Sequence, residues 1–379
     1  MVYKIWVGKR ESDILTYKFF DYSITFYGSN NDNNISFTTN ERIKASYSSD
    51  FSKFVVKSLK RLIKKDVKAE VHFYNNIFAF KIIEMCPQLK DYIVNTNSLL
   101  LLNNIRHKTL SRLWLCNTVK TPSFCLLSKS ECCVKNLERK FGKYNSFIIQ
   151  KNYSGGGSGT HLINNINELD IINRLNNDDL YLASPYYYPS QSLSCHILID
   201  ENTCVVFPVS EQILYTKNDK LEYVGNKYIP NNSQESKSVK YYASKIGELL
   251  RIAGYRGICG FDFINNNKQI MLIEINPRYQ GSSYIINYSL NKSGLPSLFE
   301  LNNICFQSSM PSNLIKRIET LNIRYSNQYI EYNNRNDIVS ANKIINEPNN
   351  IVFLDGFDKA SKFEKGCYLL RYIFPCDEL

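Results

Sequence analysis

Two short apolar segments carrying acidic and amide side chains constrain this chain's fold more than any other feature. The first spans residues 257–265 and contains Asp262, and the second spans 269–276 and contains Glu274 and Asn276. Successive side chains alternate across a strand, so Glu274 and Asn276 share one face. In an antiparallel pair of strands, Asp262 can point to that same face. The spacing therefore predicts three oxygen ligands that converge on one point.

Such a set of ligands suits Mg²⁺, which prefers carboxylate, amide and phosphate oxygens. Arg278 follows directly after Pro277 and could hold a phosphate or carboxylate through its planar guanidinium. The alternative is an ordinary strand with polar residues on its solvent face. Acidic and amide residues are depleted in strands, so the spacing favours the metal site.

A second segment combines a strand, a basic residue and a glycine loop. Residues 147–151 read as a strand that ends at Lys151, and the loop SGGGSG leads into a further strand at 160–163. We expect a hairpin whose glycines bring backbone N–H groups close to phosphate oxygens. The loop lacks the Gly-Lys-Ser/Thr ending of a Walker A motif. A flexible hairpin tip without a ligand remains the alternative.

Charge and cysteine content narrow the function classes. Lys and Arg number 46 against 35 Asp and Glu, a net charge of +11 spread along the chain. This excess favours an anionic ligand as much as nucleic acid, and no basic cluster with interleaved aromatics supports nucleic-acid binding. Eleven cysteines without a CxxC pair predict reduced thiols in a cytoplasmic protein rather than disulfides or zinc. No apolar run approaches the ~18 residues of a membrane span.

Elements along the chain suggest two kinds of domain. Strands and helices alternate over residues 1–103, which predicts a small α/β domain, and no GxGxxG marks a dinucleotide site there. A helix is expected over 104–116 with Ile105, Leu110, Leu113 and Trp114 on one side. The strongest amphipathic helix is expected over 238–254.

Together, the strand–lysine–glycine-loop segment and the later G-F-D-F … E-I-N-P-R segment resemble the ATP-grasp superfamily, in the branch of biotin carboxylase, carbamoyl phosphate synthetase and D-alanine–D-alanine ligase. The resemblance implies an α/β N-terminal domain followed by an α+β ATP-grasp fold, whose two subdomains clamp ATP. The implied parts are a pre-ATP-grasp domain at 1–103, an ATP-grasp domain at 104–300 with a lid subdomain at about 120–182 and a central subdomain at about 183–300, and a segment at 301–379 that completes or flanks it.

The same resemblance implies a set of site residues. One or two Mg²⁺ ions, or Mn²⁺ in their place, would be held by Asp262, Glu274 and Asn276, while Arg278 would face the carboxylate or acyl phosphate. The implied ATP-binding residues are Lys108, Lys151, Gly155, Gly156, Gly157, Ser158, Gly159, Ser184 and Tyr186. A solvated helix lysine remains the alternative for Lys108.

One departure from the family pattern concerns the hinge between the two subdomains. Family members usually place a glutamate there to hold the ribose hydroxyls, but residues 183–194 contain no acidic side chain. Ser184, Gln191 or Ser192 could replace it. The stretches 210–212 and 223–226 resemble the lining of the acceptor side.

The activity implied by the resemblance is an ATP-dependent ligase that joins a carboxylate to an amine through an acyl phosphate. Small-molecule carboxylate and amine substrates are expected, with a peptide or carrier protein as a further option, a homodimer allowed, and neither nucleic acid nor membrane involved. A carboxylase or carbamoyl-phosphate-type enzyme is one alternative, although the chain lacks a biotinyl-attachment Met-Lys-Met motif and has one ATP-grasp unit. A non-catalytic nucleotide-binding relative is the other.

Overall fold

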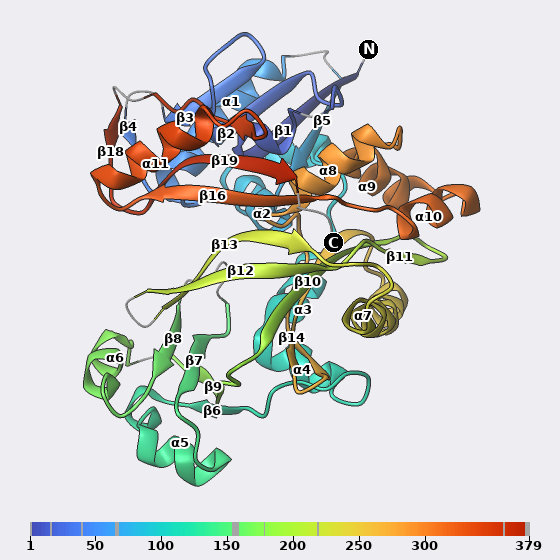
Figure 1. The fold of residues 1–379 in the computed structure, drawn as a ribbon. Helices are drawn as coiled ribbons and strands as arrows, with labels where there is room; N and C mark the ends of the chain where they lie inside the picture. Colours follow the sequence, from blue (N-terminus) through green and yellow to red (C-terminus); the bar gives the residue numbers. More distant parts are fainter. Residues whose placement is uncertain are drawn as a thin grey trace.

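The structure is a computed structural model that describes residues 2–15, 17–38, 41–64, 68–153, 159–177, 179–217, 220–358 and 361–375. Its strands form sheets of four, nine and four strands and one two-stranded pair. In Figure 1 the N-terminal sheet lies at the top, the second four-stranded sheet at the bottom, and the nine-stranded sheet between them.

The N-terminal sheet is parallel and has the order β3-β2-β1-β5. The chain lays β2 and β3 on one side of β1 and then places β5 on the other, so the order reverses between β1 and β5. This confirms the predicted α/β domain. Its elements are β1 (Val2–Arg10), β2 (Tyr22–Tyr27), β3 (Asn34–Thr38), α1 (Ser49–Leu62), β5 (Lys68–Phe73) and α2 (Asn76–Met85).

A second sheet of four strands, β6-β9-β7-β8, forms the lid subdomain. Its strands β7 and β8 pair antiparallel, with Gln150 opposite Thr160, which confirms the predicted hairpin. Phe147 and Ile149 are buried in the core of this subdomain. The elements are β6 (Cys125–Leu127), α5 (Val134–Phe141), β7 (Phe147–Lys151), β8 (Thr160–Ile163), α6 (Glu168–Arg174) and β9 (Tyr181–Pro185).

The nine-stranded sheet has the order β15-β14-β10-β12-β13-β16-β19-β17, with β11 paired to β10. Strands from residues 301–379 therefore extend the central sheet, and β18 (Lys362–Phe363) also pairs with β4 (Glu41–Arg42) of the N-terminal part. The remaining strands are β10 (Gln191–Ile199), β11 (Cys204–Val206), β12 (Ser210–Lys217), β13 (Lys220–Tyr228), β14 (Gly257–Asn266), β15 (Gln269–Asn276), β16 (Tyr325–Tyr332), β17 (Ile351–Phe353) and β19 (Cys367–Pro375).

The predicted amphipathic helix is α7 (Gln234–Ile252), which buries Val239, Ala243, Ile246 and Leu250 against the sheet. None of the helices in the described ranges is long and apolar enough to cross a bilayer. The other helices are α3 (Leu99–Arg106), α4 (Lys108–Leu115), α8 (Ser283–Lys292), α9 (Leu298–Gln307), α10 (Ser312–Glu319) and α11 (Arg335–Ile345), with the short turns η1 (Glu11–Asp13), η2 (Pro87–Tyr92) and η3 (Lys129–Glu131).

The helix expected over 104–116 is wrong in two respects. The chain breaks at His107, whose side chain accepts the backbone N–H of Leu110 and caps α4. The four apolar residues also do not share one environment, because Ile105 is buried whereas Leu110, Leu113 and Trp114 are 44%, 56% and 43% exposed. The inward face of α4 instead carries Lys108 and Arg112, both buried. Arg112 donates to the carbonyl of Ile273 in β15, at 3.3 Å from both Nε and Nη2.

Candidate active site

A cleft of about 500 Å³ lies between the lid sheet and the nine-stranded sheet. Strands β7, β8 and β9 supply its lid side, while β10, β12, β13, β14 and β15 supply its floor, and the first turn of α4 closes one end. Polar and charged side chains line much of it. Those used below are Lys108, Gln150, Ser184, Tyr186, Glu211, Gln212, Asp262, Glu274, Asn276, Arg278 and Gln280.

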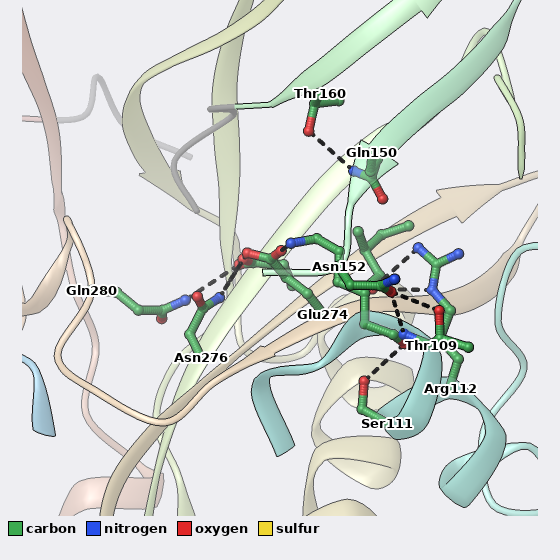
Figure 2. Close-up of polar contacts among 12 residues, drawn as sticks. Thr109, Ser111, Arg112, Gln150, Asn152, Thr160, Glu274, Asn276 and Gln280 are labelled. Atoms are coloured by element: carbon green, nitrogen blue, oxygen red, sulfur yellow. Dashed lines mark hydrogen bonds and ion pairs between the residues drawn. The ribbon is translucent and has the colours of Figure 1, made fainter. Parts of the chain in front are cut away.

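Three predicted metal ligands meet in this cleft. Asp262 stands opposite Glu274 in the antiparallel pair β14–β15, and Asn276 stands opposite Gly260. The Nδ2 atom of Asn276 donates to Asp262 Oδ2 at 2.8 Å and to Glu274 Oε1 at 3.2 Å. Figure 2 shows Glu274, Asn276 and Gln280 pointing to this common point. The strand spacing thus brings the three side chains together as expected.

The two carboxylates have different electrostatic surroundings. Burial raises the pKa of Asp262 to about 7, and the negative charge of Glu274 adds to the rise. Burial acts in the same direction on Glu274, but Lys108, Arg278 and the hydrogen bond from Asn276 together outweigh it and lower the pKa of Glu274. The Nζ atom of Lys108 lies 2.7 Å from Glu274 Oε2, and the lysine side chain is 3% exposed. Two cations, Lys108 and Arg278, therefore act on this pair of adjacent carboxylates.

This donor set fits a hard divalent cation. Two carboxylates and a side-chain amide supply the kind of oxygen ligands that Mg²⁺ prefers, and a bound cation would oppose the burial and the charge of Glu274 that raise the pKa of Asp262. Within the described ranges no three His, Cys, Asp or Glu side chains form a metal cluster. The amide of Asn276 is accordingly a necessary third member of the set.

Two glutamine side chains donate hydrogen bonds to Asp262. Gln212 Nε2 donates to Asp262 Oδ1 at 3.0 Å, and Gln280 Nε2 donates to the same oxygen at 3.3 Å. A Cβ atom at Gly260 would lie 2.0 Å from Cδ of Gln280, so a larger residue there would displace this glutamine. Close packing against Gln280 thus explains why the G-F-D-F motif begins with a glycine. Sequence reasoning gave neither glutamine this role, because each comes from a different loop or strand.

The predicted phosphate-binding lysines occupy different positions. Lys108 lines the cleft at the first residue of α4, as the resemblance implies. Lys151 does not line it. Its side chain is 40% exposed and its Nζ atom lies 2.6 Å from Asp179 Oδ2. A direct contact of Lys151 with a nucleotide therefore stays a prediction.

The neighbouring Gln150 faces the cleft instead. Its side chain is nearly buried, Nε2 donates to Thr160 Oγ1 at 3.3 Å, and the buried Oε1 has no hydrogen-bond partner among the described residues. Phe147 and Ile149 point into the lid core, so alternation turns Ile148 and Gln150 to the cleft. The same alternation in the sequence already indicates that Gln150 faces away from the apolar core. Gln150 was missed because the phosphate contact was assigned to the basic residue Lys151.

The glycine loop is only partly described. Gly155, Gly156, Gly157 and Ser158 lie outside the described residues, so their predicted contact with phosphates is not addressed by the structure. Gly159 is described, has a positive φ of 72° and accepts the backbone N–H of Lys151 at 3.1 Å. It thereby forms the base of the hairpin loop.

The predicted hinge residues line the cleft, and one further residue, Glu211, lines it with them. Ser184 and Tyr186 line the cleft, although the backbone N–H of Tyr186 is donated to the carbonyl of Ser146 at 3.1 Å. Ser192 donates to Gln212 Oε1 at 2.7 Å. Glu211 of β12 also lines the cleft, and it supplies a carboxylate that the hinge sequence lacks.

Arg278 stands beside the acidic cluster. Its Nη2 atom donates to Asn276 Oδ1 at 3.1 Å and its Nη1 atom donates to the carbonyl of Tyr279 at 2.8 Å. The same side chain lines both the main cleft and a small cavity next to it, whose other lining residues include Tyr74. Arg278 is therefore placed between the metal-ligand cluster and the N-terminal domain.

A lid sheet over a larger sheet, with paired carboxylates and a lysine in the cleft between them, defines the ATP-grasp class of nucleotide-binding fold. Residues 105–282 match the family model of the ATP-grasp domain, and the described sheets have the arrangement of an ATP-grasp fold.

Comparisons with individual proteins agree with this fold. The curated [butirosin acyl-carrier protein]--L-glutamate ligase of Niallia circulans is 30% identical over 152 residues, which are 38% of this chain. The chain spans about a third of that relative's length, since the match covers 35% of it. The N5-carboxyaminoimidazole synthetase of Staphylococcus aureus, solved with ADP, superposes over 100% of this chain and 95% of its own, with a TM-score of 0.66 and 15% identity.

Two further solved structures have the same architecture. The L-amino acid ligase of Bacillus licheniformis aligns over 99% of this chain and 94% of its own, with a TM-score of 0.63 and 10% identity. The biotin carboxylase domain of the Hydrogenobacter thermophilus 2-oxoglutarate carboxylase, solved with MgADP, aligns over 99% and 86%, with a TM-score of 0.66 and 13% identity. At these identities the likeness concerns the fold.

Proposed function

We propose that this protein is an ATP-dependent carboxylate–amine ligase that forms an amide bond and releases ADP and phosphate. The observation that carries the proposal is the cluster of Asp262, Glu274 and Asn276, with Lys108 on one side and Arg278 on the other, inside the cleft under the lid. This arrangement gathers hard oxygen ligands and two cations where a transferred phosphoryl group needs them.

The chemistry explains why these groups suffice without a nucleophilic side chain. A carboxylate oxygen of the substrate attacks the γ-phosphorus of ATP, and ADP leaves. The amine nitrogen of the second substrate then attacks the acyl carbon, phosphate departs with that carboxylate oxygen, and the nitrogen loses a proton. Both steps develop negative charge on phosphoryl or acyl oxygens, so positioning and charge neutralisation are the main tasks of the protein.

Each residue of the cluster has a role in that sequence. Asp262, Glu274 and Asn276 would hold one or two Mg²⁺ ions, with Mn²⁺ as a substitute, and bound Mg²⁺ supplies positive charge to the phosphate oxygens. Lys108 would turn from Glu274 toward the phosphates, and Arg278 would hold the reacting carboxylate. The lid residue Gln150 supplies an amide where a lysine was expected.

The remaining nucleotide contacts are predictions of the same proposal. Ser184 and Tyr186 line the hinge side of the cleft and would border the adenine, with Glu211 near enough to the same cavity to bind ribose hydroxyls. The loop Gly155–Gly159 would close over the phosphates when the nucleotide binds, with Lys151 beside it and paired with Asp179.

An amino acid is the substrate class we propose. The relative from Niallia circulans is named for joining L-glutamate to an acyl-carrier protein, and another structural neighbour is an L-amino acid ligase. A small molecule, a peptide or a carrier-bound group would supply the other reactant. A cytoplasmic location and a homodimer belong to the proposal as well, and analytical ultracentrifugation tests the second.

A carboxylase is the second candidate, since N5-carboxyaminoimidazole synthetases and a biotin carboxylase domain share the fold. Bicarbonate would then take the place of the substrate carboxylate at Arg278. The two candidates differ in the reactant that releases phosphate from ATP.

The test is a phosphate-release screen with purified protein, ATP and Mg²⁺, with mass spectrometry of the products. Reactions contain single amino acids, pairs of amino acids, dipeptides, or bicarbonate with an amine. The proposal expects phosphate release that requires a carboxylate and an amine, a product heavier by the expected condensation, and loss of both in Glu274→Gln. Release that requires bicarbonate favours the carboxylase. ADP binding without any phosphate release indicates a non-catalytic relative.

A further inference from the structure

Two cationic side chains lie at the point where the N-terminal parallel sheet reverses its order. Lys9 and Arg10 are the last two residues of β1, and β1 lies between β2 and β5. The chain places β2 to one side of β1 and β5 to the other, so the carboxyl ends of β1 and β5 border a topological switch point. Open α/β sheets bind their ligands in the crevice at such points.

The cations there have no carboxylate partners. Among the described residues no acidic side chain lies within ion-pair distance of Lys9, Arg10 or Arg278. The nearby acid Asp13 is already paired, since its Oδ1 lies 2.8 Å from Nη2 of the buried Arg371. The positive charges at the end of β1 are therefore offset only at longer range, by Asp13 and Asp355, and not by an ion pair among the described residues.

Aromatic rings surround these cations in place of acids. The guanidinium of Arg10 lies 4.4 Å from the ring centroid of Tyr368 and 5.8 Å from that of Tyr329, and its buried Nε has no hydrogen-bond partner in the part of the chain that the structure describes. The Nζ atom of Lys9 lies 5.1 Å from the ring centroid of Tyr47, whose buried hydroxyl also has no hydrogen-bond partner among these residues. Buried donors without acceptors are costly, so such donors point to a ligand that supplies acceptors.

The charges act on one another. Burial lowers the pKa of Lys9 to about 8, and the positive charges of Arg10 and Arg278 lower it further, while Asp13 opposes them. Arg10 and Arg278 also act on the hydroxyl of Tyr47, where burial raises the pKa. Lys9, Arg10, Tyr47 and Arg278 thus form one electrostatic unit, which we call the β1 cationic site.

This site adjoins the main cleft. Arg278 lines the cleft and also the small cavity at the carboxyl end of β5. On the other side, the Tyr329 ring packs against Tyr223, 5.9 Å between centroids, and Tyr223 lines the cleft. Arg278 and the Tyr223–Tyr329 ring pair therefore connect the β1 cationic site to the main cleft.

We propose that the β1 cationic site binds a second anionic group, a carboxylate or a phosphate ester, of the substrate whose reacting carboxylate lies at Arg278. The proposal rests on the proposed ligase function and specifies its substrate class: amino acids or related acids with an additional negative charge. The donors of Arg10 and Tyr47 that lack acceptors supply hydrogen bonds to the anion, and Lys9 supplies a positive charge at the end of a flexible side chain.

The test measures equilibrium binding by calorimetry in the presence of Mg²⁺ and ADP, so that it does not depend on turnover. Two matched pairs of probes separate the sources of the anion: L-glutamate against L-glutamine, and O-phospho-L-serine against L-serine. We expect the wild type to bind at least one anionic probe about tenfold or more tightly than its neutral partner. Equal affinity within both pairs, or no binding of either anionic probe, overturns the site.

Substitutions of Lys9 test whether the preference for an anionic probe arises at the β1 cationic site. Lys9→Met should weaken the preferred anionic probe about tenfold, leave its neutral partner and ADP within about twofold, and Lys9→Arg should restore most of the affinity. Loss of ADP affinity together with probe affinity in Lys9→Met overturns the assignment, because it indicates a structural role. The anion site and the ligase function can fail independently. Phosphate release with neutral amino acids, without a preference for anionic probes, would support the ligase function and contradict the site. Anion-selective binding without phosphate release would support the site and contradict the ligase function.

Discussion

Lys108 and Glu274 form a buried ion pair, with 2.7 Å between Nζ and Oε2, that joins the first residue of α4 to strand β15. Helix α4 turns Leu110, Leu113 and Trp114 to solvent while it buries this lysine. Helix α4 therefore turns a polar face inward, which places Lys108 beside the carboxylates and leaves apolar side chains exposed. Such an arrangement is expected of a site that handles negative charge rather than of a core.

Removing the cation should destabilise the protein. Lys108→Met removes the ion-pair partner of Glu274 and leaves Arg278 as the remaining cation beside the two carboxylates, and we expect a loss of about 3 kcal/mol in the free energy of unfolding, measured by denaturant titration without Mg²⁺. The double variant with Glu274→Gln should regain most of it. Lys135→Met, on the exposed face of α5, is the matched control. Equal stability of Lys108→Met and Lys135→Met would contradict this account.

The metal ligands and their supports should differ in how strongly they affect turnover. Glu274→Gln and Asn276→Ala each remove a ligand, and we expect phosphate release to fall by about 10²-fold or more, with saturating Mg²⁺ failing to restore it. Gln280→Leu removes only a hydrogen bond to Asp262, so the cost should be about tenfold and appear as a raised Mg²⁺ requirement. Magnesium titrations of the initial rate measure both effects. Wild-type rates in Asn276→Ala would rule out its role as a ligand.

Adjacent residues of β7 allow a sharp comparison. Gln150 faces the cleft with an unpartnered amide oxygen, while Lys151 is paired with Asp179 outside it. We expect Gln150→Leu to raise the dissociation constant for ATP about tenfold, the equivalent of one lost hydrogen bond in a buried site, and Lys151→Met to change it less than threefold. Isothermal titration with a non-hydrolysable ATP analogue measures both. The reverse order of effects would assign the nucleotide contact to the lysine.

Binding of the preferred anionic probe should depend on pH through Lys9. The folded-state pKa of Lys9 is about 8, so its positive charge is present below that pH and lost above it. A bound anion favours the charged form, and affinity should therefore fall as pH rises from 7 to 9.5. Arg10 keeps its charge over this range because Tyr368 and Asp13 raise its pKa, and Tyr47 stays neutral because burial raises its pKa. The other charged groups that act on Lys9 are Arg278, Asp13 and Lys44.

Lys9→Arg supplies the control for that experiment, since arginine stays charged throughout. Its affinity for the same probe should be nearly independent of pH between 7 and 9.5. A wild-type protein whose affinity does not change over this range would show that the anion is bound without Lys9.

The parts of the site that the sequence predicted are those set by short-range geometry. Alternation within β15 and pairing with β14 across a short turn place Asp262, Glu274 and Asn276 together, and the β7–β8 hairpin follows from a glycine loop between two strands. Neither depends on packing with distant parts of the chain. Local periodicity was therefore enough to predict both features.

The rest depends on contacts between distant segments. Lys108 meets Glu274 across 166 positions, and the strands of residues 301–379 return to the central sheet, which periodicity within either segment cannot indicate. The exposed apolar face of α4 contradicts the rule that the apolar stripe is buried, because a polar cleft lies on its other side. Gln150 was missed because a lysine followed it directly.

The most direct test of the central claim follows the carboxylate oxygen. The most active carboxylate from the phosphate-release screen is labelled with ¹⁸O in both oxygens and incubated with the protein, ATP, Mg²⁺ and the amine, and the phosphate is analysed by mass spectrometry. An acyl phosphate requires one ¹⁸O atom in each phosphate released and one in the amide product. Amide product formed alongside unlabelled phosphate would contradict the account, because the carboxylate would then not have been phosphorylated.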